Sequence, residues 1–419
     1  MSWLEKMHHP EKYWKIPLKW GILGTVMGIL GGLVGAGFHH VLHFVTSVRE
    51  ENLWLVWLLP AGGLLTLGIY HVAKLRRNRG TNEIIDAILK GDSVNPLIAP
   101  VIFASTALTH LFGGSAGREG AALQLGGSMA SMLSKVLKLD ENERTVLIMS
   151  GMSAVFAGLF GTPLTATLFT MEFASVGTIF SPALLPCYLA AFAASRVSGE
   201  LGVHAEGMLL ETALPFNFPV GWRLMVLAVL VGILGIVMCW LFHNAEHLAQ
   251  KYIQNAWLRI SLGGAVVAIL TMLVGDHRYN GAGMHMALMA VAGDADWFDF
   301  LMKMAFTAVT LSAGFKGGEI VPTFCIGATF GGVLGGILGL EPGIAAALAL
   351  VGLFCCATNS PIASIILSIE MFGSANLYWF AFVCVIAFVI SGNWSLYHSQ
   401  IIRYSKSRMV ERHYQGENH

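Results

Sequence analysis

The sequence is short of charge. Charged residues make up 12% of its 419 positions, where soluble proteins carry about 25%. Lys and Arg together equal Asp and Glu at 25 each, so no basic excess exists to neutralise phosphates, which excludes nucleic acid as a partner. With 55% hydrophobic residues and a mean hydropathy of +0.66, a disordered chain and an ordinary soluble enzyme are excluded too. The remaining class is a polytopic α-helical membrane protein.

Cysteine is also scarce. The six cysteines all lie in apolar sequence, and none shows a metal-ligand spacing or a paired extracellular pattern. We therefore expect no metal, no cofactor and no catalytic constellation, so the chain is not expected to be an enzyme. The alternating ten-residue segments of an outer-membrane barrel are absent as well, because the apolar runs are longer and unbroken.

Long apolar runs fill most of the chain. The first two cover about 21–48 and 53–73, and a basic cluster at 74–79 follows them. With basic segments also at the N-terminus and at 403–412, the positive-inside rule places both termini in the cytoplasm. Further runs cover roughly 95–113, 120–138, 145–175, 180–197, 220–250, 257–274, 283–294, 299–313, 322–340, 343–357, 360–373 and 377–392. Several are shorter than the roughly 20 residues that cross a bilayer, which predicts re-entrant or discontinuous helices.

The two halves of the chain resemble each other around a polar linker near 200–219. Each half contains a glycine-rich polar loop, at 113–120 and 314–322. Some 40 residues after each loop come a proline and then, nine residues later, Glu172 or Glu370. We therefore predict one transport domain over 1–419, with pseudo-repeats of about 20–205 and 220–400 and a substrate site where they meet.

The two loops favour an anion. A glycine-rich break exposes backbone N–H groups, and the helix after it adds the positive end of its dipole. A phosphate-binding loop is the rival interpretation, but the first loop lacks the Gly-Lys-Ser/Thr ending and neither loop lies in a strand–loop–helix unit. Two helix N-termini near the membrane midplane would hold a small anion and still release it.

Each loop also contains an acid. The Glu119 carboxylate would occupy the anion site and leave it on protonation, or it would only complement the helix dipole. Glu319 could be a proton carrier, a mobile ligand or a cap. Arg118 and Lys316, which precede them, could simply snorkel. Elsewhere, Glu172 and Glu370 fit carboxylates that end helices, Tyr397 fits an interface anchor or an anion donor, and the histidines fit solvated or packing roles.

Taken together, these features resemble the CLC family of chloride channels and anion/proton antiporters. The run 117–120, Gly-Arg-Glu-Gly, resembles the family's gating-glutamate motif. The run 317–322, Gly-Gly-Glu-Ile-Val-Pro, resembles its second anion-binding motif, with Ile320 where chloride members have phenylalanine. The run 391–393 leading to Tyr397 is similar to the end of the family's last membrane helix, where a tyrosine hydroxyl reaches the central anion.

The resemblance spans roughly residues 20–400 and implies an all-α membrane fold, a CLC-like inverted repeat of many short, tilted and discontinuous helices. It also implies a homodimer with a separate pathway in each subunit. The resemblance implies that Glu119 and Glu319 carry out gating and proton coupling. The residues implied for anion binding are Gly117, Arg118, Gly120, Gly318, Ile320, Val321 and Tyr397, with Thr81 and Asn82 as replacements for a serine of the family.

Three departures from the chloride members are informative. The run 80–84 reads Gly-Thr-Asn-Glu-Ile where those members have Gly-Ser-Gly-Ile-Pro. Phe173 stands where chloride/proton antiporters carry an internal proton-transfer glutamate, and Glu319 is an additional acid. Together these departures are similar to the bacterial fluoride-exporting branch of the family.

We therefore predict an antiporter in the inner membrane of a bacterium that exports fluoride in exchange for protons. A fluoride site must replace a strong hydration shell with several N–H or O–H donors. A chloride/proton antiporter or a passive anion channel of the same fold is the alternative. A cation transporter would instead need acids or aromatic residues along the pore without helix N-termini. The expected partners are fluoride or chloride, protons, lipid and a second copy of the chain.

Overall fold

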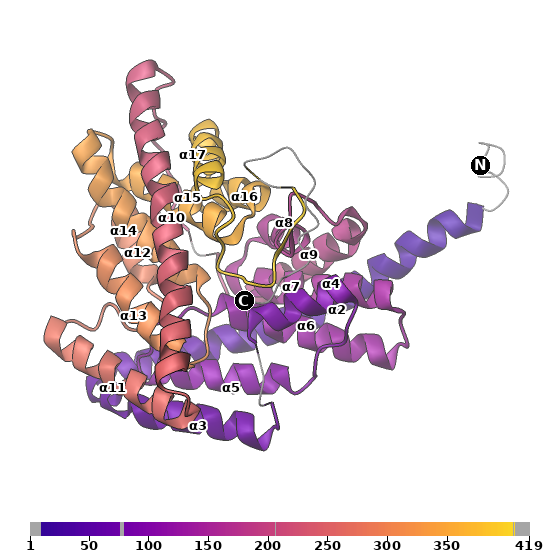
Figure 1. The fold of residues 1–419 in the computed structure, drawn as a ribbon. Coiled ribbons are helices and arrows are strands. Elements are labelled where there is room, and N and C mark those ends of the chain that lie inside the picture. The colour runs from indigo at the N-terminus through magenta and orange to yellow at the C-terminus, as the bar shows by residue number, and fades with distance from the viewer. Residues whose placement is uncertain (1–9, 76–78, 206, 405, 407–419) are drawn as a thin grey trace.

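The computed structural model describes residues 10–75, 79–205, 207–404 and 406, and for residues 10–13 the backbone alone. Part of each basic terminus and of the basic cluster at 74–79 lies outside these residues. The described chain is almost entirely helical, and its strands are β1 (Ser175–Val176) and β2 (Ile401–Ile402), which pair in parallel. The predicted all-α membrane fold is confirmed (Figure 1).

The helices match the apolar runs closely. They are α2 (Pro10–Glu51), η1 (Leu53–Leu58), α3 (Leu59–Val72), α4 (Thr81–Lys90), α5 (Ile98–Leu111), α6 (Glu119–Val136), α7 (Glu141–Phe160), α8 (Pro163–Glu172), η2 (Ser181–Ala183), α9 (Leu184–Glu200), α10 (Phe218–Tyr252), α11 (Ala256–Val274), α12 (Met284–Val291), α13 (Asp299–Ala313), α14 (Ile320–Leu338), α15 (Pro342–Thr358), α16 (Pro361–Phe372) and α17 (Leu377–Ile390). Six described spans are long and apolar enough to cross a membrane: Trp14–Glu51, Leu53–Val72, Glu141–Phe160, Phe218–Tyr252, Ala256–Val274 and Ile320–Leu338. Several others are shorter, as predicted for discontinuous helices.

Two regions differ from the predicted runs. The run 145–175 forms two helices, because Gly161 adopts φ +69° and Pro163 starts α8, where its missing N–H is not needed. Helix α4 follows no apolar run, because it is a short amphipathic helix with charged residues on one side. Its hidden face still packs against α6 and α7, so hydropathy alone does not reveal it.

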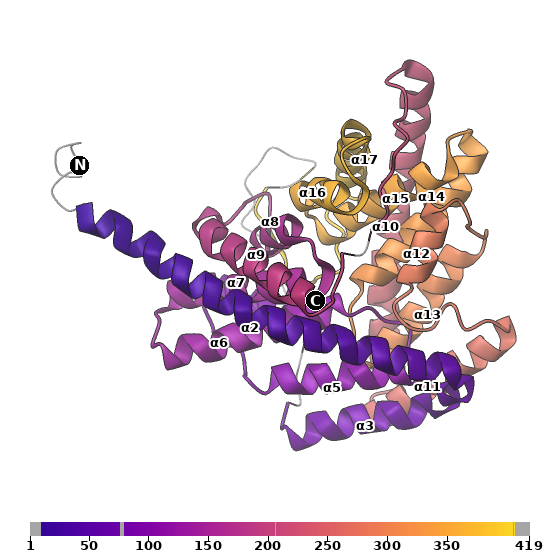
Figure 2. The ribbon, with the colours of Figure 1, turned by 180° about the vertical axis from the view of Figure 1, so that it is seen from behind.

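Glycine allows the helices of the first half to pack closely. The long helix α2 crosses this half and lies along α7 and α9 (Figure 2). A Cβ on Gly28 would lie 2.5 Å from the carbonyl oxygen of Ala190, and one on Gly126 would lie 2.1 Å from that of Gly151. Such contact between backbones is how small residues stabilise membrane helix packing. Helices α6 and α7 are in this way fixed against each other at the centre of the half.

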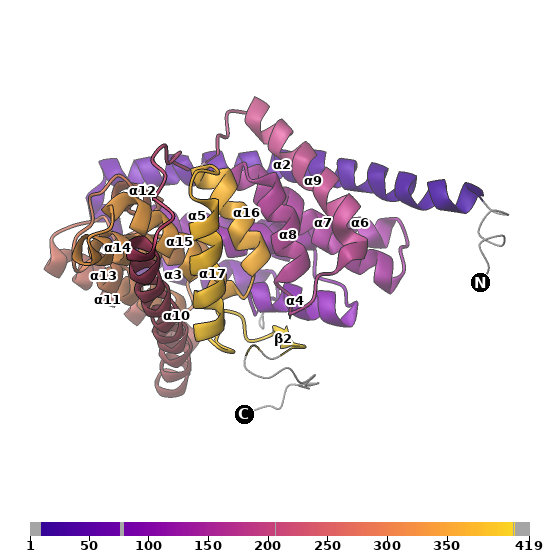
Figure 3. The same ribbon diagram turned by 90° about the horizontal axis from the view of Figure 1, so that it is seen from above.

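A pair of carboxylates joins the two halves, which lie beside each other around α8 and α16 (Figure 3). Glu172, at the end of α8, accepts hydrogen bonds from the backbone N–H groups of Ile362 (3.2 Å) and Ala363 (2.9 Å) at the start of α16. Glu370, near the end of α16, accepts from Leu164 (2.9 Å) and Thr165 (2.8 Å) at the start of α8. Each acid thus caps the N-terminus of the other half's helix.

Candidate anion site between two helix N-termini

The two glycine-rich loops contact each other directly. We call residues 113–119 the first loop and residues 314–319 the second loop. The N–H of Gly117 donates to the carbonyl of Gly318 (2.7 Å), and the N–H of Gly318 donates to the carbonyl of Gly117 (2.8 Å). This short antiparallel bridge brings the N-termini of α6 and α14 together.

The Glu119 carboxylate lies between these N-termini. Its Oε2 accepts from the backbone N–H groups of Arg118 (3.1 Å) and Val321 (3.1 Å). The residue is fully buried, and Oε1 has no hydrogen-bond partner among the described residues. A Cβ on Gly117 would lie 2.3 Å from Oε2, and one on Gly318 would lie 3.1 Å from it, so only glycine leaves room for the carboxylate. The carboxylate is therefore held as an anion would be held at helix N-termini.

The predicted donors divide into two groups. The N–H groups of Gly117 and Gly318 are used by the other loop in this conformation, whereas those of Arg118 and Val321 point at the carboxylate. The Arg118 guanidinium lies 5.2 Å from the centre of the Phe160 ring and 3.4 Å from His39 Nδ1, and its charge still acts on the Glu119 carboxylate. The hydrogen bonds that hold Glu119 Oε2 come from backbone N–H groups. Gly120 and Ile320 lie in the first turns of the two helices, both buried.

Tyr397 and Thr81 lie close to this centre. The Tyr397 hydroxyl is buried without a hydrogen-bond partner in the described structure, and its ring stands edge-on to Phe173 at 5.8 Å between centroids. Thr81 Oγ1 would lie 3.0 Å from a Cβ on Gly120, which places it beside the first turn of α6. Asn82 instead uses its Oδ1 to accept from the N–H of Ser399 (3.0 Å), so it fixes the segment after Tyr397.

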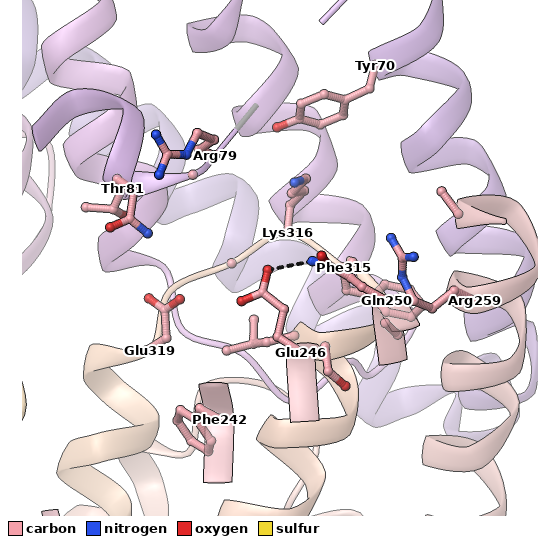
Figure 4. A pocket seen from close by; sticks show the side chains of 18 of the residues that line it. Tyr70, Arg79, Thr81, Phe242, Glu246, Gln250, Arg259, Phe315, Lys316 and Glu319 are labelled. Carbon is pink, nitrogen blue, oxygen red and sulfur yellow. Dashed lines mark hydrogen bonds between the residues drawn. The ribbon is translucent and has the colours of Figure 1, made fainter. Parts of the chain in front are cut away.

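A cavity of about 1100 Å³ leads to this centre. Thr81, Asn82, Tyr397 and Glu319 all line it, and Figure 4 shows the Glu319 carboxylate pointing into it. Glu319 is half-buried, in contrast to Glu119. The structure therefore brings the residues of three distant sequence motifs to one place, with one acid enclosed between the loops and the other at the cavity wall.

Gln124 also lines the cavity and was not predicted. Its Nε2 donates to the carbonyl of Gly120 (3.0 Å), which leaves Oε1 buried without a partner within residues 79–205 or the other described segments. An amide oxygen at the wall of this cavity can accept a hydrogen bond from a donor such as a protonated carboxyl group. The signal in the sequence was a lone amide in the first turns of an apolar helix.

Lys303 is the second residue that the sequence analysis missed. It lies on α13, is fully buried, and donates to Ser115 Oγ (3.0 Å) and to the carbonyls of Tyr279 (3.1 Å) and Gly281 (2.7 Å). Ser115 N–H also donates to Thr310 Oγ1 (3.1 Å). The first loop is thus fastened to the second half of the chain. A lysine inside an apolar run was the available signal, since intramembrane charge is costly.

Metal ligation has no candidate in the described segments, because no three His, Cys, Asp or Glu side chains there are placed to share an ion. All six cysteines are buried and unbridged. Around Glu119 the structure places backbone N–H donors, and the buried Tyr397 hydroxyl lies close by.

Known proteins resemble this chain over most of its length. The family of voltage-gated chloride channels matches residues 65–392. A chloride/fluoride channel protein of Pseudomonas syringae pv. tomato is 33% identical over 415 residues, covering 96% of this chain and 91% of that protein. An H(+)/Cl(-) exchange transporter of Vibrio vulnificus is 24% identical over 390 residues, covering 85% and 82%.

Solved structures agree with this result. The crystal structure of a CLC-type fluoride/proton antiporter aligns with a TM-score of 0.89 at 34% identity, covering 92% of this chain and 98% of that one. A slow cyanobacterial Cl⁻/H⁺ antiporter aligns with a TM-score of 0.76 at 19% identity, covering 89% and 94%. The second likeness concerns the fold alone.

Proposed function

Because the chain belongs to the family of voltage-gated chloride channels, also called the CLC family, we propose that it exports fluoride in exchange for protons. The two relatives at 33% and 34% identity are a chloride/fluoride channel protein and a fluoride/proton antiporter. The exchangers of chloride and protons are more distant, at 24% and 19%. This ordering supports fluoride, with chloride/proton exchange or passive anion conduction as the alternative.

The position of the Glu119 carboxylate is the observation that carries the proposal. It accepts from Arg118 N–H and Val321 N–H between two helix N-termini, where a free anion would bind. Protonation removes its charge and with it the attraction to the helix dipoles, so an anion takes its place. A carboxylate that competes with the substrate and leaves as a neutral acid couples anion movement to proton movement.

Glu319 supports fluoride as the anion. Fluoride is small and strongly hydrated, so its site needs donors of high strength. The Tyr397 hydroxyl is an unused donor at the cavity, and Glu319 becomes a second one when it carries a proton. Phe173 leaves no acid at the place of the internal glutamate of chloride/proton antiporters, so Glu319 is the natural proton carrier of this chain.

The assembly that we propose is a homodimer in a bacterial inner membrane, with both termini cytoplasmic and a complete pathway in each subunit. The chain is proposed to be one transport domain built from two inverted repeats. Exposed large apolar side chains on α9, α16 and α17 offer a surface for a second copy, among them Leu185, Ile362, Val385 and Val389. Light scattering in detergent tests this: a fully active monomer would contradict the dimer.

Transport in proteoliposomes tests the function itself. Vesicles loaded with fluoride or with chloride are diluted into anion-free buffer, and anion efflux and proton uptake are followed together. We expect fluoride to leave faster than chloride, with protons entering in fixed proportion. Equal rates for both anions favour the chloride alternative, and efflux without proton uptake favours a passive channel.

A further inference from the structure

The last turns of α10 carry a polar stripe. His243, Glu246, His247 and Gln250 recur at helical spacing, and all four line the cavity. Glu246 Oε1 accepts from Gln250 Nε2 at 2.9 Å (Figure 4). The earlier turns of this helix are apolar. Asn244 and Lys251 lie in the same turns outside the cavity lining, so the end of the helix is polar on more than one side, but its one acid, Glu246, lines the cavity.

Glu246 and Glu319 are the two acids among the described residues that line the cavity. Glu246 is exposed and Glu319 is half-buried, and their carboxylates point into the same part of the cavity (Figure 4). The two groups interact electrostatically with each other, and Lys316 interacts with both. Glu246 is thus the solvent-facing member of an acid pair whose inner member lies at the anion centre.

The other charged groups at the cavity disfavour free protons. Arg79, Arg259 and Lys316 line it and draw anions in, while the same potential repels hydronium. Phe173 cannot carry a proton, and it is fully buried and packs against Phe169 and Tyr397. A proton that leaves Glu319 on this side therefore passes through the cavity, where a carboxylate is a stronger base than water.

We infer that Glu246 is this carboxylate, the group that passes protons between Glu319 and the water outside the cavity. The inference rests on the proposed fluoride/proton exchange. In the inward step the O–H bond of protonated Glu319 breaks, and a new O–H bond forms on the Glu246 carboxylate, directly or through water that the cavity has room for. Glu246 then returns the proton to bulk water, and both acids end as carboxylates.

Other titratable and charged side chains line the same cavity as Glu246. They are His243 and His247 on α10, Tyr70 and His71 on α3, Arg79 before α4, Arg259 on α11, Lys316 and Glu319 on the second loop, and Tyr397 and His398 after α17. The rings of His243 and His398 lie 3.7 Å apart between centroids, so these two histidines pack against each other.

The test replaces Glu246 with an isosteric amide. Glu246→Gln keeps the shape of the side chain and the hydrogen bond to Gln250 but carries no proton between groups. We expect coupled fluoride/proton exchange in proteoliposomes to slow about tenfold or more, the scale at which a proton-transfer group acts. The solvent deuterium isotope effect should rise, and high concentrations of a weak-acid buffer on the cavity side should restore the rate. Glu246→Asp, which retains a carboxyl, should keep most of the activity.

Glu51→Gln serves as the matched control, because Glu51 is an exposed acid at the end of α2, outside the cavity. If the parent exchanges fluoride for protons while Glu246→Gln keeps its rate, isotope effect and buffer dependence, the assignment of Glu246 is wrong and the transport function stands. If the parent moves fluoride without protons, the proposed exchange fails first, and the role of Glu246 falls with it.

Discussion

The first and second loops have similar sequences and similar places before a helix, yet their surroundings differ. Ser115 of the first loop is fastened by Lys303 and Thr310, and the loop also receives a hydrogen bond from Asn280 Nδ2 to the Gly113 carbonyl (2.7 Å). The second loop instead sends Lys316 to within 4.9 Å of the Tyr70 ring centre, at the wall of the cavity.

Because their surroundings differ, the two glycine-rich loops are suited to different tasks. The fastened loop keeps its donors in place, so in the proposed mechanism its acid, Glu119, acts at a fixed anion site. The second loop places its acid, Glu319, at the cavity. The proposed exchange of an anion and a proton would thus be divided between a rigid side and an accessible side.

Removing the charge from the enclosed acid should have the largest effect. Glu119→Gln resembles a carboxyl group that is always protonated, so it no longer competes with the anion. We expect fluoride movement without proton coupling, or no turnover, in the proteoliposome assay. Glu141→Gln, an exposed acid in the first turn of α7, is the control. Unchanged coupled exchange in Glu119→Gln would remove Glu119 from the mechanism.

Replacing Glu319, the acid at the cavity, should have the second-largest effect on fluoride export. Glu319→Ala deletes a proton carrier and a charge-assisted hydrogen bond of up to about 3 kcal/mol, which corresponds to a fluoride export rate roughly 100-fold lower. Size-exclusion chromatography checks that the protein keeps its assembly. Should Glu319→Ala export fluoride like the parent, and should the parent move chloride as fast as fluoride, then the generic anion transporter replaces the fluoride proposal.

Removing the hydrogen bonds of Lys303 to the first loop should lower the free energy of unfolding more than it slows transport. Lys303→Met removes the donor to the carbonyls of Tyr279 and Gly281, at about 1 kcal/mol or more each, whereas Ser115 Oγ keeps Thr307 Oγ1 as a partner, so we expect a loss of about 2 kcal/mol. Thermal unfolding in detergent measures it as a lower midpoint. Lys251→Met, at the exposed end of α10, should leave the midpoint unchanged. Equal midpoints for the two variants would show that the loop does not depend on Lys303.

The smallest effect is expected at the second loop's lysine. Lys316→Gln removes one positive charge from the cavity, so fluoride should enter a few-fold more slowly at low ionic strength. The difference should vanish in high salt, because salt screens the attraction that Lys316 provides. Measuring the fluoride efflux rate against salt concentration checks this. A deficit that persists at high salt would assign Lys316 a role other than attraction.

The sequence predicted most of the helices and the two glycine-rich loops that meet, because both depend on local patterns. Apolar runs marked most helices, and the glycines around Glu119 and Glu319 marked the breaks between them. The capping roles of Glu172 and Glu370 were not predicted, since their partners lie 190 and 206 positions away. A helix-end acid looks the same in sequence whether it meets water or another helix.

The parts that were missed depend on contacts across the fold. Lys303 binds Ser115 over 188 positions, and Glu246 faces Glu319 only because α10 lies along the cavity. Asn82 Oδ1 accepts from Ser399 N–H over 317 positions, a contact that the sequence does not reveal, and its role as an anion ligand stays a prediction. The type of each residue can be read in the sequence, whereas its partner follows from tertiary packing.

The exchanged carboxylate caps of α8 and α16 bear on the ancestry of the chain. Glu172 caps the N-terminus of α16 in the second half, and Glu370 caps the N-terminus of α8 in the first half. Two copies of one polypeptide related by a twofold axis make reciprocal contacts of this kind, because a residue of each copy contacts the same site on the other copy. A half-length ancestor that carried one such helix would already have held a second copy of itself, so fusing two genes would have preserved an existing contact instead of requiring a new one.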